Sequence, residues 1–148
     1  MRATVPGAAR ALDQNPQLRF MMFGRASDIN DQLRHHLNLR DVTTIHHTDV
    51  VIAADEKPSV ALRQGRDSSM RKAIEAVSTG AAHCVVSSGN TGALMATAKI
   101  VLKTLPGIHR PAIASTMPTE KGSCIMLDLG ANIECDSEML VQFAILGA

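Results

Sequence analysis

Two short apolar runs with a helical pattern between them dominate the first third of the chain. Residues 18–23 and 42–45 have the length and apolar character of buried strands. Gly24 turns the chain after the first run, and Ser27 can cap the helix that follows. The residues that repeat there at helical spacing are Ile29, Leu33, His36 and Leu37. This order of strand, helix and strand predicts a βαβ unit.

Helical patterns and apolar runs continue to alternate through the middle of the chain. Apolar stripes within residues 5–12 and 68–77 predict two amphipathic helices, the second of them capped by serine. Residues 84–87 are expected to form a short strand that enters a polar turn. A long helix with its apolar face over residues 94–105 is predicted to follow that turn.

The last part of the chain contains two further apolar runs and a helix. The runs at residues 112–117 and 124–127 flank a polar loop and form either a hairpin or two separate strands. From Ser137 onward the helical pattern is apolar on nearly every side, which predicts burial on more than one face. Together these elements predict an α/β fold with a mainly parallel sheet that is covered by helices on both faces.

Both ends of the sequence are unusual for a complete domain. The chain opens on a helical pattern with no strand before it, and it stops at Ala148 inside an apolar helix. We therefore expect residues 1–148 to form one partial domain that is incomplete at both ends.

Composition excludes several classes of function. The 15 basic and 14 acidic residues leave a net charge of +1, and three Phe without Trp or Tyr offer little surface for base stacking. Nucleic acid is therefore not an expected partner. The three Cys, without a CxxC pair, predict buried reduced thiols, and the six His suggest no metal site. Because no signal peptide or membrane-length apolar run is present, we expect a soluble, cytoplasmic protein.

The sharpest candidate site is the glycine-bounded turn between the predicted strand at residues 84–87 and the helix after it. Free backbone N–H groups and the helix dipole at this position favour an anion. The turn consists of Ser88, Gly89, Asn90, Thr91 and Gly92, whose hydroxyls and amide can bond phosphate or a developing oxyanion. The same residue types also serve as ordinary turn and capping residues. Neither a Walker A loop nor a GxGxxG loop is present.

Two weaker candidates lie elsewhere. Basic residues flank the helix start at Ser68 and Ser69; they are Arg63, Arg66, Arg71 and Lys72. This set either seats an anionic group or is a solvated basic helix face. Asp128 and Asn132 follow a predicted strand at the edge where open α/β sheets place ligands, although both residue types also serve turns.

Several segments in order resemble the PlsX family of bacterial phosphate acyltransferases. They include Pro58-Ser59-Val60-Ala61-Leu62-Arg63, Asp67-Ser68-Ser69-Met70, Ser87-Ser88-Gly89-Asn90-Thr91-Gly92-Ala93-Leu94-Met95, Gly107-Ile108-His109-Arg110-Pro111-Ala112, Leu127-Asp128-Leu129-Gly130-Ala131-Asn132 and Gln142-Phe143-Ala144. Ser88 departs from the family, which usually has Ala there. The family's opening Met-Gly-Gly-Asp strand and everything after the Gln142 helix are also absent.

The resemblance implies transfer of a long-chain acyl group from acyl carrier protein to inorganic phosphate, giving an acyl phosphate for phospholipid synthesis. It implies the layered fold of isocitrate and isopropylmalate dehydrogenases, no cofactor, a homodimer in the full-length form and a possible membrane or membrane-acyltransferase partner. On this basis Asn90 and Thr91 are the expected catalytic residues. The expected substrate-binding residues are Arg63, Ser68, Ser69, Ser88, Gly89, Gly92, Asp128 and Asn132.

Two other functions remain open from the sequence. The first is that this chain is a catalytically inactive fragment or a module that binds carrier protein. The second is a phosphotransacetylase-like enzyme that acts on acyl-CoA. The ordered set of motifs favours the enzyme that uses carrier protein over the enzyme that uses acyl-CoA.

Overall fold

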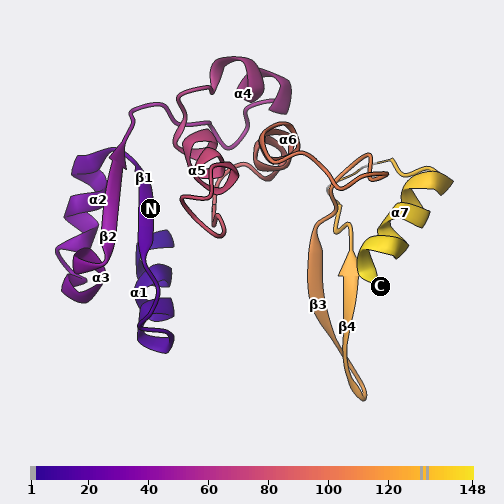
Figure 1. Cartoon of the computed structure of the whole chain (residues 1–148), viewed down its shortest axis with the longest axis horizontal. Coiled ribbons are helices and arrows are strands. Elements are labelled where there is room, and N and C mark those ends of the chain that lie inside the picture. The colour runs from indigo at the N-terminus through magenta and orange to yellow at the C-terminus, as the bar shows by residue number, and fades with distance from the viewer. Residues whose placement is uncertain (1–2, 131, 133) are drawn as a thin grey trace. The chain divides into compact units, whose positions relative to one another are not determined.

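The computed structural model describes residues 3–130, 132 and 134–148. The chain divides into two compact units, Met1–Leu102 and Lys103–Ala148. Figure 1 shows the elements of each unit in chain order.

The first unit begins with the predicted βαβ arrangement. Its elements in order are α1 (Thr4–Gln14), β1 (Phe20–Gly24), α2 (Ala26–Leu33), α3 (Leu37–Asp41) and β2 (Thr43–His47). Strands β1 and β2 pair in parallel, with α2 and α3 alongside them (Figure 1). The apolar stripes of the three helices meet in one core, whose buried members are Val5, Leu12, Ile29, Leu33 and Leu39.

The expected role of Ser27 is wrong. The residue at the amino-terminal cap of α2 is Arg25, and no side chain caps that end. Ser27 lies inside the helix and donates its hydroxyl hydrogen to Asp28 Oδ1 at 3.2 Å. The helical pattern also breaks after Leu33, and a separate short helix, α3, begins after His36, whose side chain makes no capping hydrogen bond.

The rest of the first unit is helical. It contains α4 (Pro58–Gln64), α5 (Ser69–Ser78) and α6 (Thr91–Val101), with α4 and α5 both packed against α6. The predicted cap of α5 is confirmed, since Ser68 Oγ accepts the backbone N–H of Arg71. A second core forms between these helices, with Ile52, Ala61, Met70, Ile74 and Ala93 buried. Helix α4 was not predicted, although Pro58 suits the first turn of a helix.

Two predictions on either side of the polar turn are wrong. Residues 84–87 do not form a strand, and Val86 is 81% exposed. In the described part of the chain, no strand pairs with this segment. An apolar run alone does not form a strand, because a strand needs hydrogen bonds to a neighbouring strand. Helix α6 ends at Val101 rather than near Leu105, because Lys103 takes a left-handed conformation with φ 66°.

The second unit is a hairpin and a helix. Strands β3 (Ala114–Thr119) and β4 (Gly122–Leu127) pair antiparallel. The last two apolar runs therefore form a hairpin and not two separate strands. Helix α7 (Ser137–Gly147) buries Met139, Gln142 and Phe143. Its opposite face is exposed, with Leu140 and Val141 each at 59%, so the expected burial on more than one face is wrong.

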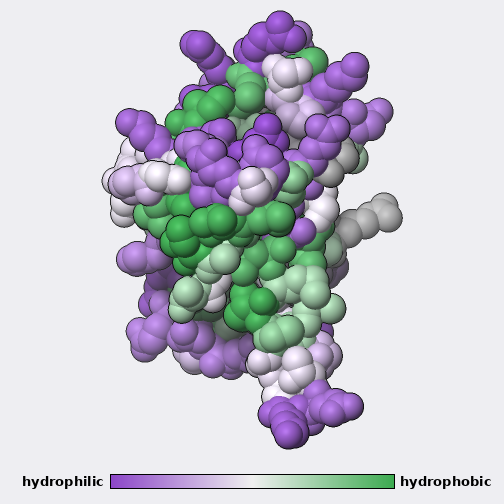
Figure 2. Space-filling view, turned by 90° about the vertical axis from the view of Figure 1, so that its right-hand side faces the viewer, coloured by the Kyte–Doolittle hydropathy of each residue, from purple (hydrophilic) through white to green (hydrophobic). Residues whose placement is uncertain are grey.

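The fold class is mixed α/β, as expected at the coarse level. The described residues form a two-stranded parallel sheet and a separate two-stranded antiparallel sheet, instead of one mainly parallel sheet. Figure 2 shows a broad area of apolar surface on the face that it presents. Among residues 3–130, 132 and 134–148, no helix has the length and apolarity needed to cross a membrane.

Candidate anion-binding site

The amino terminus of α6 presents unused backbone donors. Asn90 is the cap residue, and its Oδ1 accepts the backbone N–H of Ala93 at 3.0 Å. Within the described residues, no acceptor contacts the backbone N–H of Thr91 or Gly92. Both residues are exposed at the positive end of the helix dipole. The arrangement therefore offers two N–H donors and the Thr91 hydroxyl to an anion.

Serine hydroxyls extend this set of donors along the turn. Ser87 Oγ accepts the backbone N–H of Gly89 at 3.1 Å, which shapes the turn. Ser88 Oγ lies 3.3 Å from Thr4 Oγ1 at the start of α1. Ser87, Ser88 and Gly89 are all exposed, so the turn and its two serine side chains are accessible to solvent.

The two glycines of the turn lie close to neighbouring helices. A Cβ atom on Gly92 would lie 3.0 Å from Pro58 Cγ in α4, and one on Gly89 would lie 3.1 Å from Met70 Cε in α5. The turn is thus packed against the first turns of both helices. The helices that form the second core therefore also hold the turn in place.

The Asn90 amide is directed at a neighbouring loop. Its Nδ2 donates toward three backbone carbonyls, those of Ala53 at 3.2 Å, Ala54 at 3.1 Å and Glu56 at 2.8 Å. Sequence reasoning did not foresee this use of the side chain, because the acceptors lie more than 30 residues earlier in the chain.

The start of α5 uses its serines for local structure. Ser68 is fully buried, and its hydroxyl donates to Gly65 O at 2.6 Å while accepting from Arg71 N. The backbone N–H of Ser69 donates to Val50 O at 3.1 Å. Ser68 therefore has no unused hydroxyl donor, whereas the hydroxyl of the half-buried Ser69 makes no hydrogen bond within the described residues.

The basic residues near Ser68 are mostly engaged on the surface. Arg63 is exposed, and its Nε donates to Ser59 O at 3.2 Å. Arg71 forms an ion pair with Glu75 at 2.8 Å, and Lys72 lies 3.6 Å from Asp67. Neither Arg63 nor Arg66 makes an ion pair within the described part of the chain. The predicted basic cluster therefore resembles a solvated helix face more than a converged anion seat.

Asp128 and Asn132 lie together in the second unit. Asp128 has a left-handed backbone with φ 59°, and its carboxylate accepts from the Asn132 side-chain amide at 2.9 Å. Asn132 also donates to Pro111 O at 3.3 Å and accepts from Arg110 Nη1 at 3.5 Å. The expectation that Asp128 and Asn132 bind substrate stays a prediction. Ala131 lies outside the described residues.

The cysteines differ from the expectation. Cys84, Cys124 and Cys135 are all exposed, so the predicted burial of the thiols is wrong. Cys135 Sγ lies 3.7 Å from Asp128 Oδ2. Desolvation, and then the negative charge of Asp128, raises the pKa of the Cys135 thiol, while Arg110 acts in the opposite direction.

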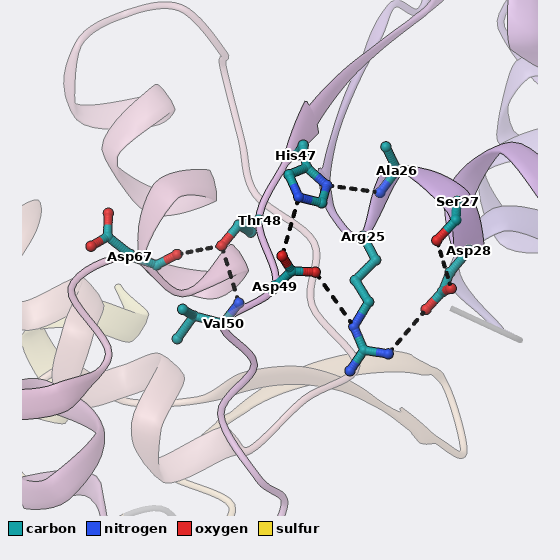
Figure 3. Close-up of polar contacts among 9 residues, drawn as sticks. All are labelled: Arg25, Ala26, Ser27, Asp28, His47, Thr48, Asp49, Val50 and Asp67. Atoms are coloured by element: carbon teal, nitrogen blue, oxygen red, sulfur yellow. Dashed lines mark hydrogen bonds and ion pairs between the residues drawn. The ribbon is translucent and has the colours of Figure 1, made fainter.

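A polar network at the carboxyl ends of β1 and β2 was missed by sequence reasoning (Figure 3). His47 Nδ1 accepts the backbone N–H of Ala26 at 3.2 Å, and its Nε2 lies 3.3 Å from Asp49 Oδ2. Arg25 Nε lies 3.9 Å from the other oxygen of Asp49. The available signal was that charged residues directly follow both strands, at the edge where α/β sheets bind ligands.

Thr48 connects this edge to the start of α5. Its buried hydroxyl donates to Asp67 O at 2.7 Å and accepts the backbone N–H of Val50 at 3.2 Å (Figure 3). The loop before Ser68 is thereby fixed to the end of β2. Among the residues that the structure describes, no group of three or more His, Cys, Asp or Glu could hold a metal ion.

Comparison with known proteins agrees with the motifs. A family model described as fatty acid synthesis protein matches residues 1–148. The phosphate acyltransferase of Rhodospirillum centenum is 57% identical over 97% of this chain and 40% of its own length. That of Beijerinckia indica is 54% identical over 99% and 38%, and that of Paramagnetospirillum magneticum is 53% identical over 97% and 41%.

The chain thus spans about 40% of the length of these curated relatives. The family match covers every residue of the chain, including the turn at Asn90 and the Asp128 loop. This chain therefore belongs to the fatty acid synthesis protein family, the PlsX family that its motifs indicate.

Proposed function

We propose that the chain forms part of an enzyme that transfers a long-chain acyl group from acyl carrier protein to inorganic phosphate. Family membership and the relatives named phosphate acyltransferase support this proposal. In the reaction a phosphate oxygen attacks the thioester carbonyl carbon, the carbon–sulfur bond breaks, and the carrier leaves as a thiolate that takes up a proton. The acyl phosphate is the other product.

The observation that carries the proposal is the pair of unused N–H groups at Thr91 and Gly92. Phosphate needs a seat of hydrogen-bond donors, and the tetrahedral intermediate needs donors directed at its oxygen. The Thr91 and Ser88 hydroxyls lie beside these groups on the same exposed turn. Inorganic phosphate is largely anionic at neutral pH. For this reason we propose no general base for its attack.

The proposed site also includes residues whose side chains form other contacts in the structure. We include Thr91 as the catalytic candidate, with Gly89 and Gly92 allowing close approach of the backbone; Asn90, the other catalytic candidate from the sequence, already binds residues 53–56 and Ala93 through its side chain. The proposed outer contacts are Arg63, Ser68, Ser69, Asp128 and Asn132. Support is strongest for Thr91, Gly92 and Ser88, since their donors face solvent.

The proposal also covers the full-length form of the enzyme, which the curated relatives represent. It includes the layered fold of isocitrate and isopropylmalate dehydrogenases, a homodimer, a cytoplasmic location and a membrane or membrane-acyltransferase partner. No cofactor is proposed, because phosphate and the thioester supply every atom and electron of the transfer.

The test is release of free thiol from palmitoyl-acyl carrier protein, with and without phosphate. This chain is compared with the full-length phosphate acyltransferase of Rhodospirillum centenum as the reference enzyme. Phosphate-dependent release by both proteins supports an active chain, and release by the reference alone assigns this chain to the inactive-fragment alternative. Palmitoyl-CoA as acyl donor tests the alternative enzyme that acts on acyl-CoA.

If the folded reference releases no thiol when phosphate is added, the assignment to acyl carrier protein is wrong. The substitution Thr91→Val in this chain tests the proposed site, since it removes one hydroxyl but keeps the size of the side chain. Any phosphate-dependent activity of the wild-type chain is expected to fall about tenfold in this variant.

A further inference from the structure

We propose that Asn90 is a positioning residue that fastens residues 53–56 to the start of α6, rather than a residue that contacts phosphate. The inference rests on the proposed function, because it assigns a role within the proposed phosphate site. It starts from the direction of the Asn90 amide, which faces the carbonyls of a loop more than 30 residues earlier.

The hydrogen-bonding capacity of Asn90 is already used. An asparagine side chain has two N–H donors on Nδ2 and one carbonyl oxygen. The donors are shared among the carbonyls of Ala53, Ala54 and Glu56 at 2.8–3.2 Å. The oxygen accepts from Ala93 N at 3.0 Å as the helix cap. No donor of this side chain remains for a phosphate oxygen.

The hydrogen bonds from Asn90 Nδ2 to the loop at residues 53–56, here called the clamp, balance the partial negative charge of the loop carbonyls. Three carbonyl oxygens converge on Asn90 Nδ2, and Asn90 directly precedes Thr91 and Gly92, whose N–H groups are unused. Without the amide, these oxygens would place partial negative charge there with no donor to balance it. Glu56 is also held within the loop, because its Oε2 accepts the backbone N–H of Ala53 at 3.3 Å.

The substitution Asn90→Ser separates the clamp from the helix cap. Serine caps helices about as well as asparagine, but its short hydroxyl cannot reach three loop carbonyls while it serves the cap. It also adds no charge that would repel phosphate directly. In this variant we expect the amides of Ala53 and Glu56 to exchange hydrogen about tenfold faster. Inorganic phosphate should bind about two- to fivefold more weakly.

The matched control is Asp136→Ser at the start of α7. Asp136 Oδ1 accepts from Met139 N at 2.8 Å, so it caps a helix in the same manner as Asn90. Among the described residues it makes no clamp to a distant loop. This control should leave both exchange at residues 53–56 and phosphate affinity unchanged. Circular dichroism of each variant checks that the helices are retained.

Hydrogen exchange and phosphate titration followed by ³¹P NMR give outcomes that can be told apart. Weaker phosphate binding together with faster exchange at Ala53 and Glu56 supports the positioning role. Weaker binding with unchanged exchange makes Asn90 a direct ligand and overturns it. Faster exchange with unchanged binding shows that the clamp does not shape the anion site, which also overturns it. If the folded wild-type chain binds no phosphate, the proposed site itself fails, and the positioning role fails with it.

Discussion

Asn90 and Asn132 hold loops by the same chemistry in different units. Asn132 Nδ2 donates to Pro111 O and to Asp128 Oδ1, just as Asn90 Nδ2 donates to carbonyls of residues 53–56. An amide carries a donor and an acceptor on one short side chain, so it can satisfy two backbone segments at once. Polar side chains next to a turn therefore often serve the turn before they serve a ligand.

The thiol of Cys135 provides a prediction at the scale of one residue. Desolvation and the Asp128 charge raise its pKa, so at a given pH it holds less reactive thiolate. In Asp128→Asn the pKa should fall, and the rate of alkylation by iodoacetamide at pH 8 should rise. In Arg110→Gln the pKa should rise further, because Arg110 lowers it, and alkylation should slow.

Mass spectrometry of each alkylated cysteine measures these rates. Cys84 is the internal control, since it lies in the other unit and its rate should not respond to either substitution. Equal alkylation rates at Cys135 in the wild type and both variants would contradict the electrostatic explanation.

The sequence located the turn at residues 88–92 but could not assign the bonds of its side chains. The capping pattern and the glycines are local signals, and local signals predicted the cap of α5 and a helix next to the turn, although α6 begins already at Thr91. The acceptors of Asn90 and the partner of Ser88 are distant in sequence. No pattern within a short window contains that information, so these contacts required the structure.

Elements with strong periodicity were predicted well, and elements that depend on partners were not. The stripes of α1 and α5 are buried as expected. Residues 84–87 have the composition of a strand, but a strand exists only through hydrogen bonds to a neighbour. The length of α6 was overestimated because apolar spacing continues to Leu105 after the backbone has turned at Lys103. Hydrophobic periodicity alone does not mark that turn.

Two glycines of the first unit, one within a helix and one at a helix end, give opposite predictions at the scale of the element. Gly7 lies within α1, and a Cβ atom there would meet nothing within 4 Å. Gly7→Ala should therefore raise the free energy of unfolding by about 0.5–1 kcal/mol, because alanine loses less backbone entropy in a helix. Urea unfolding followed by circular dichroism measures the change.

Gly65, at the carboxyl end of α4, is the matched contrast. A Cβ atom there would collide with the backbone carbonyl oxygen of Ala61, which accepts the Gly65 N–H. Gly65→Ala should lower the free energy of unfolding by about 1–3 kcal/mol, because the end of the helix must shift. A stabilising Gly65→Ala or a destabilising Gly7→Ala would show that these local contacts do not control stability.

At the scale of the molecule, buried apolar side chains are distributed unevenly between the units. The first unit contains two separate cores, one around Ile29 and Leu33 and one around Ile74. In the described part of the second unit, the buried apolar side chains are Ile108, Met139 and Phe143. Strands β3 and β4 are exposed along most of their length. A two-stranded hairpin gains little stability without a covered face.

This distribution predicts that the two units open with different free energies. Amides in β3 and β4 should exchange hydrogen at least about tenfold faster than amides in α5, because opening the hairpin exposes less buried surface. Ile74→Ala, at a fully buried position, should cost about 2–5 kcal/mol and accelerate exchange in α5 and α6. Exchange in β3 and β4 should keep its wild-type rate in that variant, as measured by mass spectrometry of peptic fragments. Acceleration of both units by the same factor would mean that the chain unfolds as one cooperative body, and the division of stability argued from the buried side chains would be wrong.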